Sequence, residues 1–433
     1  MRHRVVACPA PSTVMRRPDM STASADSVDR PDLQWRDRKR HLWLLGLVPP
    51  TALFVATALV WGGNELGLQS VTPILWWIGP LLIYVLVPLL DLFVGPDGEN
   101  PPDELFEQLE NDRFYRYCTY LYLPFQFASL VFACYLWSAG DLSWLGIDGG
   151  LGVMSKIGLA ISVGVVAGIG INTAHELGHK KVEFERRLSK WALAPSFYGH
   201  FYIEHNRGHH VRVATPEDPA SARFGESFWR FLPRSVVGSL RSAWRLERAR
   251  LERLHKPVWS VHNDVLNAWA ISVVLYAVLL GVFGLSIAPY LVIQAVFGFS
   301  LLEVVNYLEH YGLLRQKTAK GRYERCSPAH SWNSDHLVTN IFLYHLQRHS
   351  DHHANPTRRY QTLRSMEISP QLPAGYATMI TLAYIPPLWR KVMDHRVLDH
   401  YDGDITRVNI EPRRREKILA RYGASDPAAA EGK

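Results

Sequence analysis

Cysteine is scarce in this sequence and never closely spaced. Of 433 residues only Cys8, Cys118, Cys134 and Cys326 are cysteines, and no two of them form a C-x-x-C pair. Four scattered cysteines argue against a disulfide scaffold, and the lack of C-x-x-C spacing argues against a zinc finger or an iron–sulfur cluster. Any electrons that the protein uses must therefore come from elsewhere.

A nucleic-acid recognition module is also lacking, because no segment combines basic and aromatic residues in such a pattern. The formal charge is nonetheless +7 and the pI is about 9.1. This balance is typical of a protein with basic loops on the cytoplasmic side of a membrane, or of one that docks an acidic partner.

Residues 1–35 contain no long apolar run, and their polar composition predicts a disordered leader rather than a secretory signal peptide. Beyond them the apolar residues are concentrated in six runs, each close to the ~20 residues that cross a bilayer. The runs are 42–62, 71–94, 120–137, 157–173, 268–285 and 288–305. A cluster of Arg and Lys at 36–40 precedes the first run and predicts a cytoplasmic N-terminus.

The sequence therefore predicts an all-α integral membrane protein with six transmembrane helices. Residues 36–310 are expected to form the transmembrane region, interrupted by a basic cytosolic loop at 175–262. Residues 311–415 are expected to form a cytosolic catalytic cap, and 416–433 a tail. The many Lys and Arg residues of the loop fit the positive-inside rule for that placement.

Histidine is abundant where cysteine is not. Fifteen of the 19 histidines fall between His175 and His353. Nine of them form four short boxes near predicted helix ends on the cytosolic side. The boxes contain His175 and His179; His205, His209 and His210; His310; and His349, His352 and His353.

The last box carries the argument for a metal site. His349, His352 and His353 have the spacing of one helix face, where three imidazoles crowd unfavourably unless they share a cation as neutral ligands. A first-row metal takes about four to six ligands, so nine histidines indicate two metals.

Other readings of the boxes explain less. His175-Glu176-Leu-Gly-His179 matches the zinc protease signature, with Glu176 as general base. A protease needs only one further ligand and would leave most of the other seven histidines without a role. A tag-like surface cluster or satisfied core histidines would explain one box but not four. Nitrogen-rich ligation favours iron in a redox role over magnesium or calcium.

The boxes, taken with their flanking residues, closely resemble those of the integral-membrane alkane 1-monooxygenases, within the histidine-box superfamily of membrane fatty-acid desaturases and hydroxylases. The resemblance covers 35–415. The motifs that narrow it to the alkane hydroxylases are Asn306-Tyr-Leu-Glu-His-Tyr-Gly312 and Arg359-Tyr-Gln-Thr-Leu-Arg364.

This resemblance implies that all nine histidines bind a non-haem di-iron centre. It implies O2 as co-substrate, a medium- or long-chain n-alkane from the bilayer as substrate, and a 1-alkanol as product. Electrons would come from NAD(P)H through a reductase and a separate rubredoxin. The expected location is the bacterial inner membrane, with the active site on the cytoplasmic side. The basic 180–253 segment is an expected dock for acidic rubredoxin, although it could equally serve only membrane topology.

Carboxylates beside the boxes are expected to orient the ligands by hydrogen bonding to their second nitrogens. These are Glu176, Glu204, Glu309, Asp351 and Asp91, with Asp335 and Asn306 as weaker candidates. Candidates to set the depth of an apolar substrate slot are Trp76, Trp77, Ile83 and Tyr84. His200, His330, His336 and His345 lie near the boxes and receive no ligand role.

Three alternatives stay open. A fatty-acyl desaturase or hydroxylase would use the same iron site on a substrate with a head group. A xylene-type methyl hydroxylase would need a shorter, wider pocket. A non-catalytic metal-binding membrane protein would not need ligands gathered beside an apolar slot.

Overall fold

The computed structural model of the chain describes residues 35–424. The chain divides into two units, Met1–Asp37 and Arg38–Lys433, and the arrangement below is that of the second. Nearly all of the predicted leader and the last part of the predicted tail, residues 1–34 and 425–433, lie outside the described residues. The division of 36–433 into membrane region, cap and tail stays a prediction.

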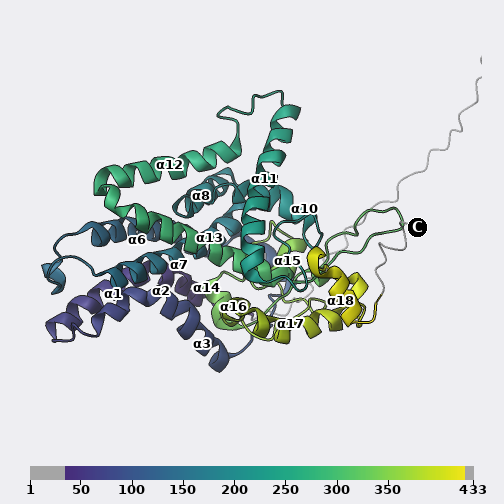
Figure 1. Ribbon diagram of the computed structural model, residues 1–433, viewed down its shortest axis with the longest axis horizontal. Coiled ribbons are helices and arrows are strands. Elements are labelled where there is room, and N and C mark those ends of the chain that lie inside the picture. Colours follow the sequence, from purple (N-terminus) through teal and green to yellow (C-terminus); the bar gives the residue numbers. More distant parts are fainter. Residues whose placement is uncertain (1–34, 425–433) are drawn as a thin grey trace, which may run out of the picture. The chain divides into compact units, whose positions relative to one another are not determined.

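The described residues form helices and isolated β-bridges, with no strand among them. Six helical segments are long and apolar enough to cross a membrane: Arg40–Glu65, Thr72–Val94, Arg113–Ser138, Val153–Gly178, Asp264–Phe283 and Leu285–His310. Each overlaps one of the six apolar runs. The prediction of an all-α, multi-pass membrane protein is therefore confirmed for this part of the chain (Figure 1).

The helices of the spans are α1 (Val48–Glu65), α2 (Ile78–Leu81), α3 (Val87–Val94), α5 (Arg113–Tyr120), α6 (Tyr122–Ser138), α7 (Val153–Gly178), α12 (Asp264–Phe283) and α13 (Ala288–His310). The other helices are α4 (Phe106–Asn111), α8 (Glu183–Leu193), α9 (Phe201–Glu204), α10 (His210–Arg212), α11 (Phe228–Arg253), α14 (Leu337–Phe342), α15 (His349–Ala354), α16 (Tyr376–Ala383), α17 (Pro386–His400) and α18 (Arg415–Arg421).

The second span is not one regular helix. A 3₁₀ segment, Thr72–Trp77, leads into α2, and a π-helical turn, Leu82–Leu86, separates α2 from α3. Pro80 and Pro88 flank the π turn. Proline removes a backbone N–H donor and disfavours the preceding helical turn, which explains the irregularity of this span.

The core of the bundle is the close contact between α7 and α13. Glycines at this contact let the two backbones approach: a Cβ on Gly164 would lie 3.0 Å from the Gln294 carbonyl oxygen, and one on Gly168 would lie 3.0 Å from that of Gly298. Small residues four apart are typical of tightly packed membrane helices. Because both helices end in histidine boxes, this contact delivers His175 and His310 to the same end of the bundle.

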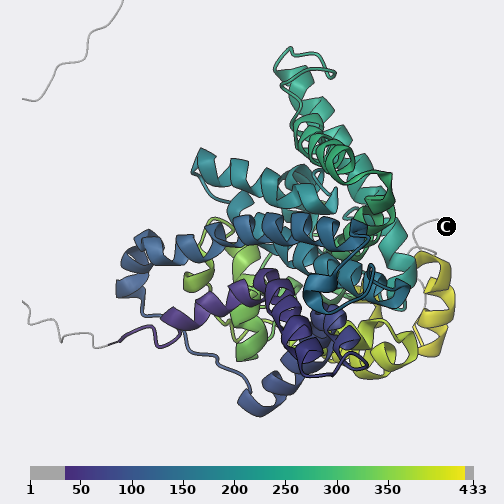
Figure 2. The ribbon, with the colours of Figure 1, turned by 90° about the vertical axis from the view of Figure 1, so that its left-hand side faces the viewer.

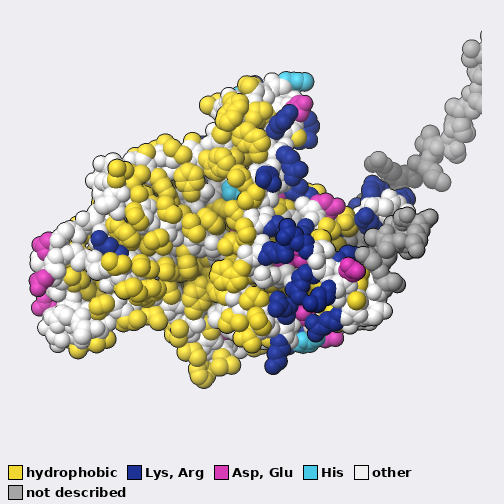
Figure 3. All heavy atoms as spheres, viewed as in Figure 1, with side chains coloured by type: hydrophobic (Ala, Val, Ile, Leu, Met, Phe, Trp, Pro, Cys, Tyr) yellow, Lys and Arg dark blue, Asp and Glu magenta, His cyan; other side chains and the backbone are white. Residues whose placement is uncertain are grey.

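The ends of the spans can be recognised by charge. Hydrophobic side chains gather over the spans, whereas Lys and Arg form a band beside them, over the region of α10, α11, α15 and α17 (Figures 1 and 3). In two views α11 and the beginning of α12 extend away from the remaining helices and are joined there by a loop (Figures 1 and 2). The histidine-bearing ends of α7 and α13 therefore lie on the side of the basic band.

Candidate metal centre

All nine histidines of the four boxes come together, in two sets. The first set contains His175, His179, His205, His210 and His352, and the second contains His209, His310, His349 and His353. Within each set, one ring nitrogen from every residue lies within 4.8 Å of the others.

Local backbone geometry explains how the sets interleave. A π turn at His205–His209 spans five residues, so His205 and His210 fall on the same side, while His209 turns toward the second set. In α15, His349 and His353 lie one α-helical turn apart and belong to the second set, but His352 belongs to the first. This differs from the expectation that His349, His352 and His353 share one cation.

The ring nitrogens converge closely. His352 Nε2 lies 2.8 Å from His175 Nε2 and 3.2 Å from His210 Nε2. In the second set, His353 Nε2 lies 2.9 Å from His349 Nε2 and 3.3 Å from His209 Nε2. Nitrogens that each lie about 2 Å from one shared cation are spaced roughly 3 Å apart. The buried Nε2 atoms of His179 and His310 have no hydrogen-bond partner within the described residues.

The imidazoles outside the spans are held in their neutral form. Burial, followed by the proximity of the other rings, lowers the pKa of each well below that of a free imidazole. They are His179, His205, His210, His349, His352 and His353. Neutral imidazole is the form that binds transition metals, so the donor set fits two cations, and its nitrogen-rich character fits iron.

Two carboxylates contact the imidazoles directly. Asp218 Oδ2 lies 2.9 Å from His209 Nδ1 and also accepts a hydrogen bond from Ser221. Glu309, one of the expected carboxylates, has Oε2 at 3.2 Å from His349 Nε2. This is the nitrogen that faces His353, not the second nitrogen, at which the sequence predicts the contact. Asp218 was not anticipated from sequence. Its only signal is its position nine residues after His209, in a loop whose path the sequence does not specify.

The other expected carboxylates, Glu176, Glu204, Asp351 and Asp91, form no hydrogen bond or ion pair with any of the nine imidazoles among the described residues, so the expectation that they orient the ligands directly is wrong; they bind neighbouring groups instead. Glu176 pairs with Lys180 at 3.0 Å, and Glu204 accepts a hydrogen bond from Arg212 at 2.6 Å. Asp351 pairs with Arg358 at 2.9 Å. Asp91, at the end of the second span, accepts hydrogen bonds from the backbone and side chain of Thr339. Asn306 donates to Glu303 at 3.4 Å.

The four additional histidines lie outside both sets. The backbone carbonyl oxygen of His330 lies 3.2 Å from His310 Nδ1. His345 Nδ1 lies 2.8 Å from the Tyr360 carbonyl oxygen, and His336 Nδ1 lies 2.9 Å from Ser334 Oγ. His200 is buried against Tyr198 and Trp269, and neither of its ring nitrogens has a partner within the described residues.

An apolar cavity of about 50 Å³ lies beneath the histidines; we call it the inner cavity. Asn172, Val305 and Leu346 line it, and they precede His175, His310 and His349 by three, five and three residues. Its two polar side chains are already engaged, because Asn172 donates to the Leu343 carbonyl and Thr339 donates to Asp91. The cavity therefore presents an apolar surface directly below the metal centre.

The expected slot residues take different positions. Ile83 lines the inner cavity, and Tyr84 lines a larger groove beside it. Trp76 is buried in the hydrophobic cluster formed by the far ends of the spans, and Trp77 packs over Gly158 of α7.

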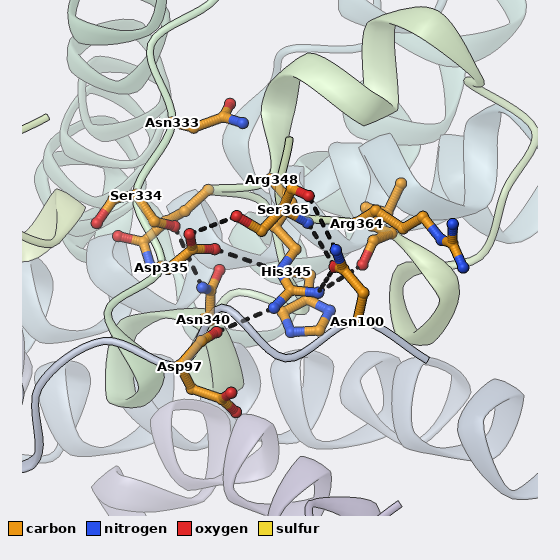
Figure 4. Close-up of polar contacts among 12 residues, drawn as sticks. Asp97, Asn100, Asn333, Ser334, Asp335, Asn340, His345, Arg348, Arg364 and Ser365 are labelled. Carbon is orange, nitrogen blue, oxygen red and sulfur yellow. Dashed lines mark hydrogen bonds and ion pairs between the residues drawn. The ribbon is translucent and has the colours of Figure 1, made fainter. Parts of the chain in front are cut away.

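A buried arginine fixes the chain that enters α15. Arg348 Nη2 donates to the carbonyl oxygens of Asp97 and Glu99 at 3.0 and 3.1 Å. Its Nη1 donates to the Leu363 carbonyl at 2.7 Å, and its Nε lies 3.5 Å from Asp335 Oδ1. Figure 4 shows Asp97, Asn100 and Asp335 around Arg348. We call these contacts of Arg348 the clamp; they hold the residue that immediately precedes His349.

Comparisons with known proteins agree with this arrangement. The fatty acid desaturase family matches residues 154–383. Alkane 1-monooxygenase of Acinetobacter baylyi is 47% identical over 397 residues, which cover 92% of this chain and 94% of the relative. Alkane 1-monooxygenase 1 of Alcanivorax borkumensis is 46% identical over 89% of this chain and 92% of its own length. The xylene/toluene monooxygenase hydroxylase component of Pseudomonas putida is 25% identical over 54% of this chain and 62% of its own length.

Proposed function

The chain belongs to the family of integral-membrane alkane 1-monooxygenases, and we propose that it hydroxylates the terminal methyl group of medium- and long-chain n-alkanes to give 1-alkanols. The observation that carries the proposal is that the apolar inner cavity is lined by residues lying three to five positions before histidines of both sets. A substrate without a polar handle can be recognised only by such a surface.

Two irons are proposed as the cofactor, one held by the five-histidine set and one by the four-histidine set. Bound there, iron would supply the reductive activation of O2 that C–H hydroxylation needs. Asp218 fixes the orientation of His209 through Nδ1, because a metal-bound imidazole is held in one tautomer by the group that its second nitrogen contacts.

The protein itself supplies orientation and a dry site. An alkane has no acidic proton, so the reaction needs no general base on the substrate. The contacts of Asn172 with the Leu343 carbonyl and of Thr339 with Asp91 reduce the polar surface that could hold water in the inner cavity. A narrow apolar cavity admits the chain end-on, which brings the terminal carbon to the metal centre before the weaker inner C–H bonds.

We further propose that rubredoxin, reduced by an NAD(P)H-dependent reductase, delivers the electrons on the cytoplasmic side of the bacterial inner membrane. Several basic residues of the expected dock are exposed, among them Arg241, Arg245, Arg248 and Arg253 on α11. Lys180 is instead buried against Glu176 and is not available to a partner. Complementary charge would speed the encounter with an acidic carrier.

The test is hydroxylation of n-octane and n-hexadecane by membranes that contain the protein, supplied with rubredoxin, its reductase and NADH. We expect 1-alkanols as products and about two irons per purified chain. His352→Ala and His353→Ala, although neighbours in sequence, affect different sets; each is expected to retain about one iron and to lose hydroxylation. His395→Ala, on the exposed side of α17, is the matched control and keeps both.

Other products would contradict the proposal. An iron-replete preparation that desaturates a fatty-acyl substrate and forms no alkanol would identify a desaturase. Faster turnover of p-xylene than of any n-alkane would favour the xylene-type activity, for which the evidence is one relative matched over about half of the chain.

A further inference from the structure

An open groove of about 700 Å³ lies beside the inner cavity; we call it the outer groove. The inner cavity and the outer groove are lined by the same structural elements. In several of these elements, two adjacent residues face different hollows. Ile83 and Tyr84, Leu301 and Ser300, and Ile380 and Thr381 are such pairs, with the first residue of each in the inner cavity. The outer groove therefore lies next to the inner cavity, and these elements form the wall between the two.

The inner cavity alone is too small for the proposed substrate. Its volume of about 50 Å³ accommodates roughly four water-sized groups, fewer than the carbons of n-octane. The remainder of a bound chain must extend past the wall between the two hollows. The outer groove is the adjoining space, and its other walls include the apolar residues Val292, Val296, Phe297 and Leu232.

Two tyrosines lie on the outer-groove side of this wall. The hydroxyl oxygens of Tyr84 and Tyr384 lie 3.0 Å apart and share one hydrogen bond. A phenol is both a donor and an acceptor, so this bond uses one O–H and leaves the other without an acceptor among the described residues. The indole N–H of Trp229 donates a hydrogen bond of 3.0 Å to the backbone carbonyl oxygen of Tyr384 and so helps to hold Tyr384 in place.

The backbone beneath Tyr84 is the least regular part of the spans. Tyr84 lies within the π turn Leu82–Leu86, between Pro80 and Pro88. Short π segments in helices are frequent at functional sites and carry fewer ideal hydrogen bonds than an α-helix. Tyr84 can thus move away from Tyr384 at a lower cost than a residue of a regular helix.

An alkane and a primary alcohol differ at this wall. An alkane that separates the tyrosines leaves two hydroxyls without partners in apolar surroundings, which is unfavourable. The hydroxyl of an alcohol can accept from one tyrosine and donate to the other. We propose that the outer groove is a binding site for the primary alcohol product, with the alcohol hydroxyl between Tyr84 and Tyr384 and the alkyl chain along the groove. This inference rests on the proposed function, because that function makes the alcohol the product.

The experiment measures binding without turnover. Ser300→Cys places a thiol in the groove, and its alkylation by a maleimide is followed in detergent without an electron donor. Dodecane, 1-chlorododecane and 1-dodecanol are added at equal mole fractions in the micelle. Val274→Cys, on the exposed face of α12, is the control position. Labelling of the unmutated chain is subtracted.

We expect 1-dodecanol to protect Ser300→Cys at a concentration about tenfold lower than dodecane or the chloride, the size of one hydrogen bond to a hydroxyl. Tyr84→Phe and Tyr384→Phe, each combined with Ser300→Cys, should remove this difference, and Val274→Cys should be unprotected throughout. Equal protection by the three compounds, or a tenfold preference that survives both Phe variants, would overturn the proposal. Because no turnover is involved, a chain that fails to hydroxylate alkanes can still give either result.

Discussion

Arg348→Lys tests whether the clamp before α15 holds the metal centre together. Lysine keeps the positive charge but replaces a planar fork of five donors by a single ammonium group. The fork donates hydrogen bonds to four acceptors: the carbonyls of Asp97, Glu99 and Leu363 and the side-chain oxygen of Asn100. Its Nε also lies in an ion pair with the Asp335 carboxylate. Arg348 is fully buried, so water cannot replace the lost donors.

The magnitude follows from the acceptors left unpaired. One ammonium group can reach about two of the four, and each buried acceptor without a donor costs about 1–3 kcal/mol. The expected loss is therefore about 2–6 kcal/mol, which we expect to lower the melting temperature by about 2–7 °C in a chain of this size. Because Arg348 precedes His349 directly, the iron content of the second set should fall with it.

The assay combines differential scanning fluorimetry in detergent with iron analysis of the same samples. Arg187→Lys is the matched control, because its ion pair with Glu183 is exposed and exposed pairs contribute little. We expect that variant to melt like the unmutated chain. If Arg348→Lys melts within 1 °C of the unmutated chain and keeps its iron, the clamp does not position α15.

Three further predictions follow from particular contacts. Gly164→Ala should lower the melting temperature by several degrees, because its Cβ would lie 3.0 Å from the Gln294 carbonyl oxygen. Gly62→Ala is the control, since nothing lies within 4 Å of its Cβ position. A smaller effect at Gly164 would mean that α7 and α13 can separate freely. Burial raises the pKa of Asp394 to about 6 despite its hydrogen bond from Tyr311. As the pH rises, the unfolded state therefore loses this proton first, and the stability of the fold falls between about pH 4 and 6. Asp394→Asn should raise the melting temperature at pH 8 but not at pH 4. An equal gain at both pH values would exclude this titration. If the basic surface docks an acidic electron donor, the apparent KM for rubredoxin should rise steeply with added salt while kcat is nearly constant, and a salt-independent KM would argue against electrostatic docking.

The sequence by itself determined the features that depend on local pattern. Six apolar runs of membrane-spanning length predicted the six spans, because hydrophobic matching to the bilayer acts on each segment separately. The four boxes predicted which nine histidines gather, because so many imidazoles at helix ends are best explained as ligands of shared metal ions. The motifs around His310 and after His353 also carried the resemblance that the relatives confirm.

Only the tertiary structure decided how these parts combine. The assignment of His209 and His210, or of His352 and His353, to different sets depends on a π turn and on the packing of α15, and neither follows from spacing along a regular helix. The contact of Asp218 with His209 depends on the path of a loop. The outer groove brings Tyr84 against Tyr384, 300 residues apart. Such contacts are set by the packing of the whole chain, and a local pattern carries no information about them.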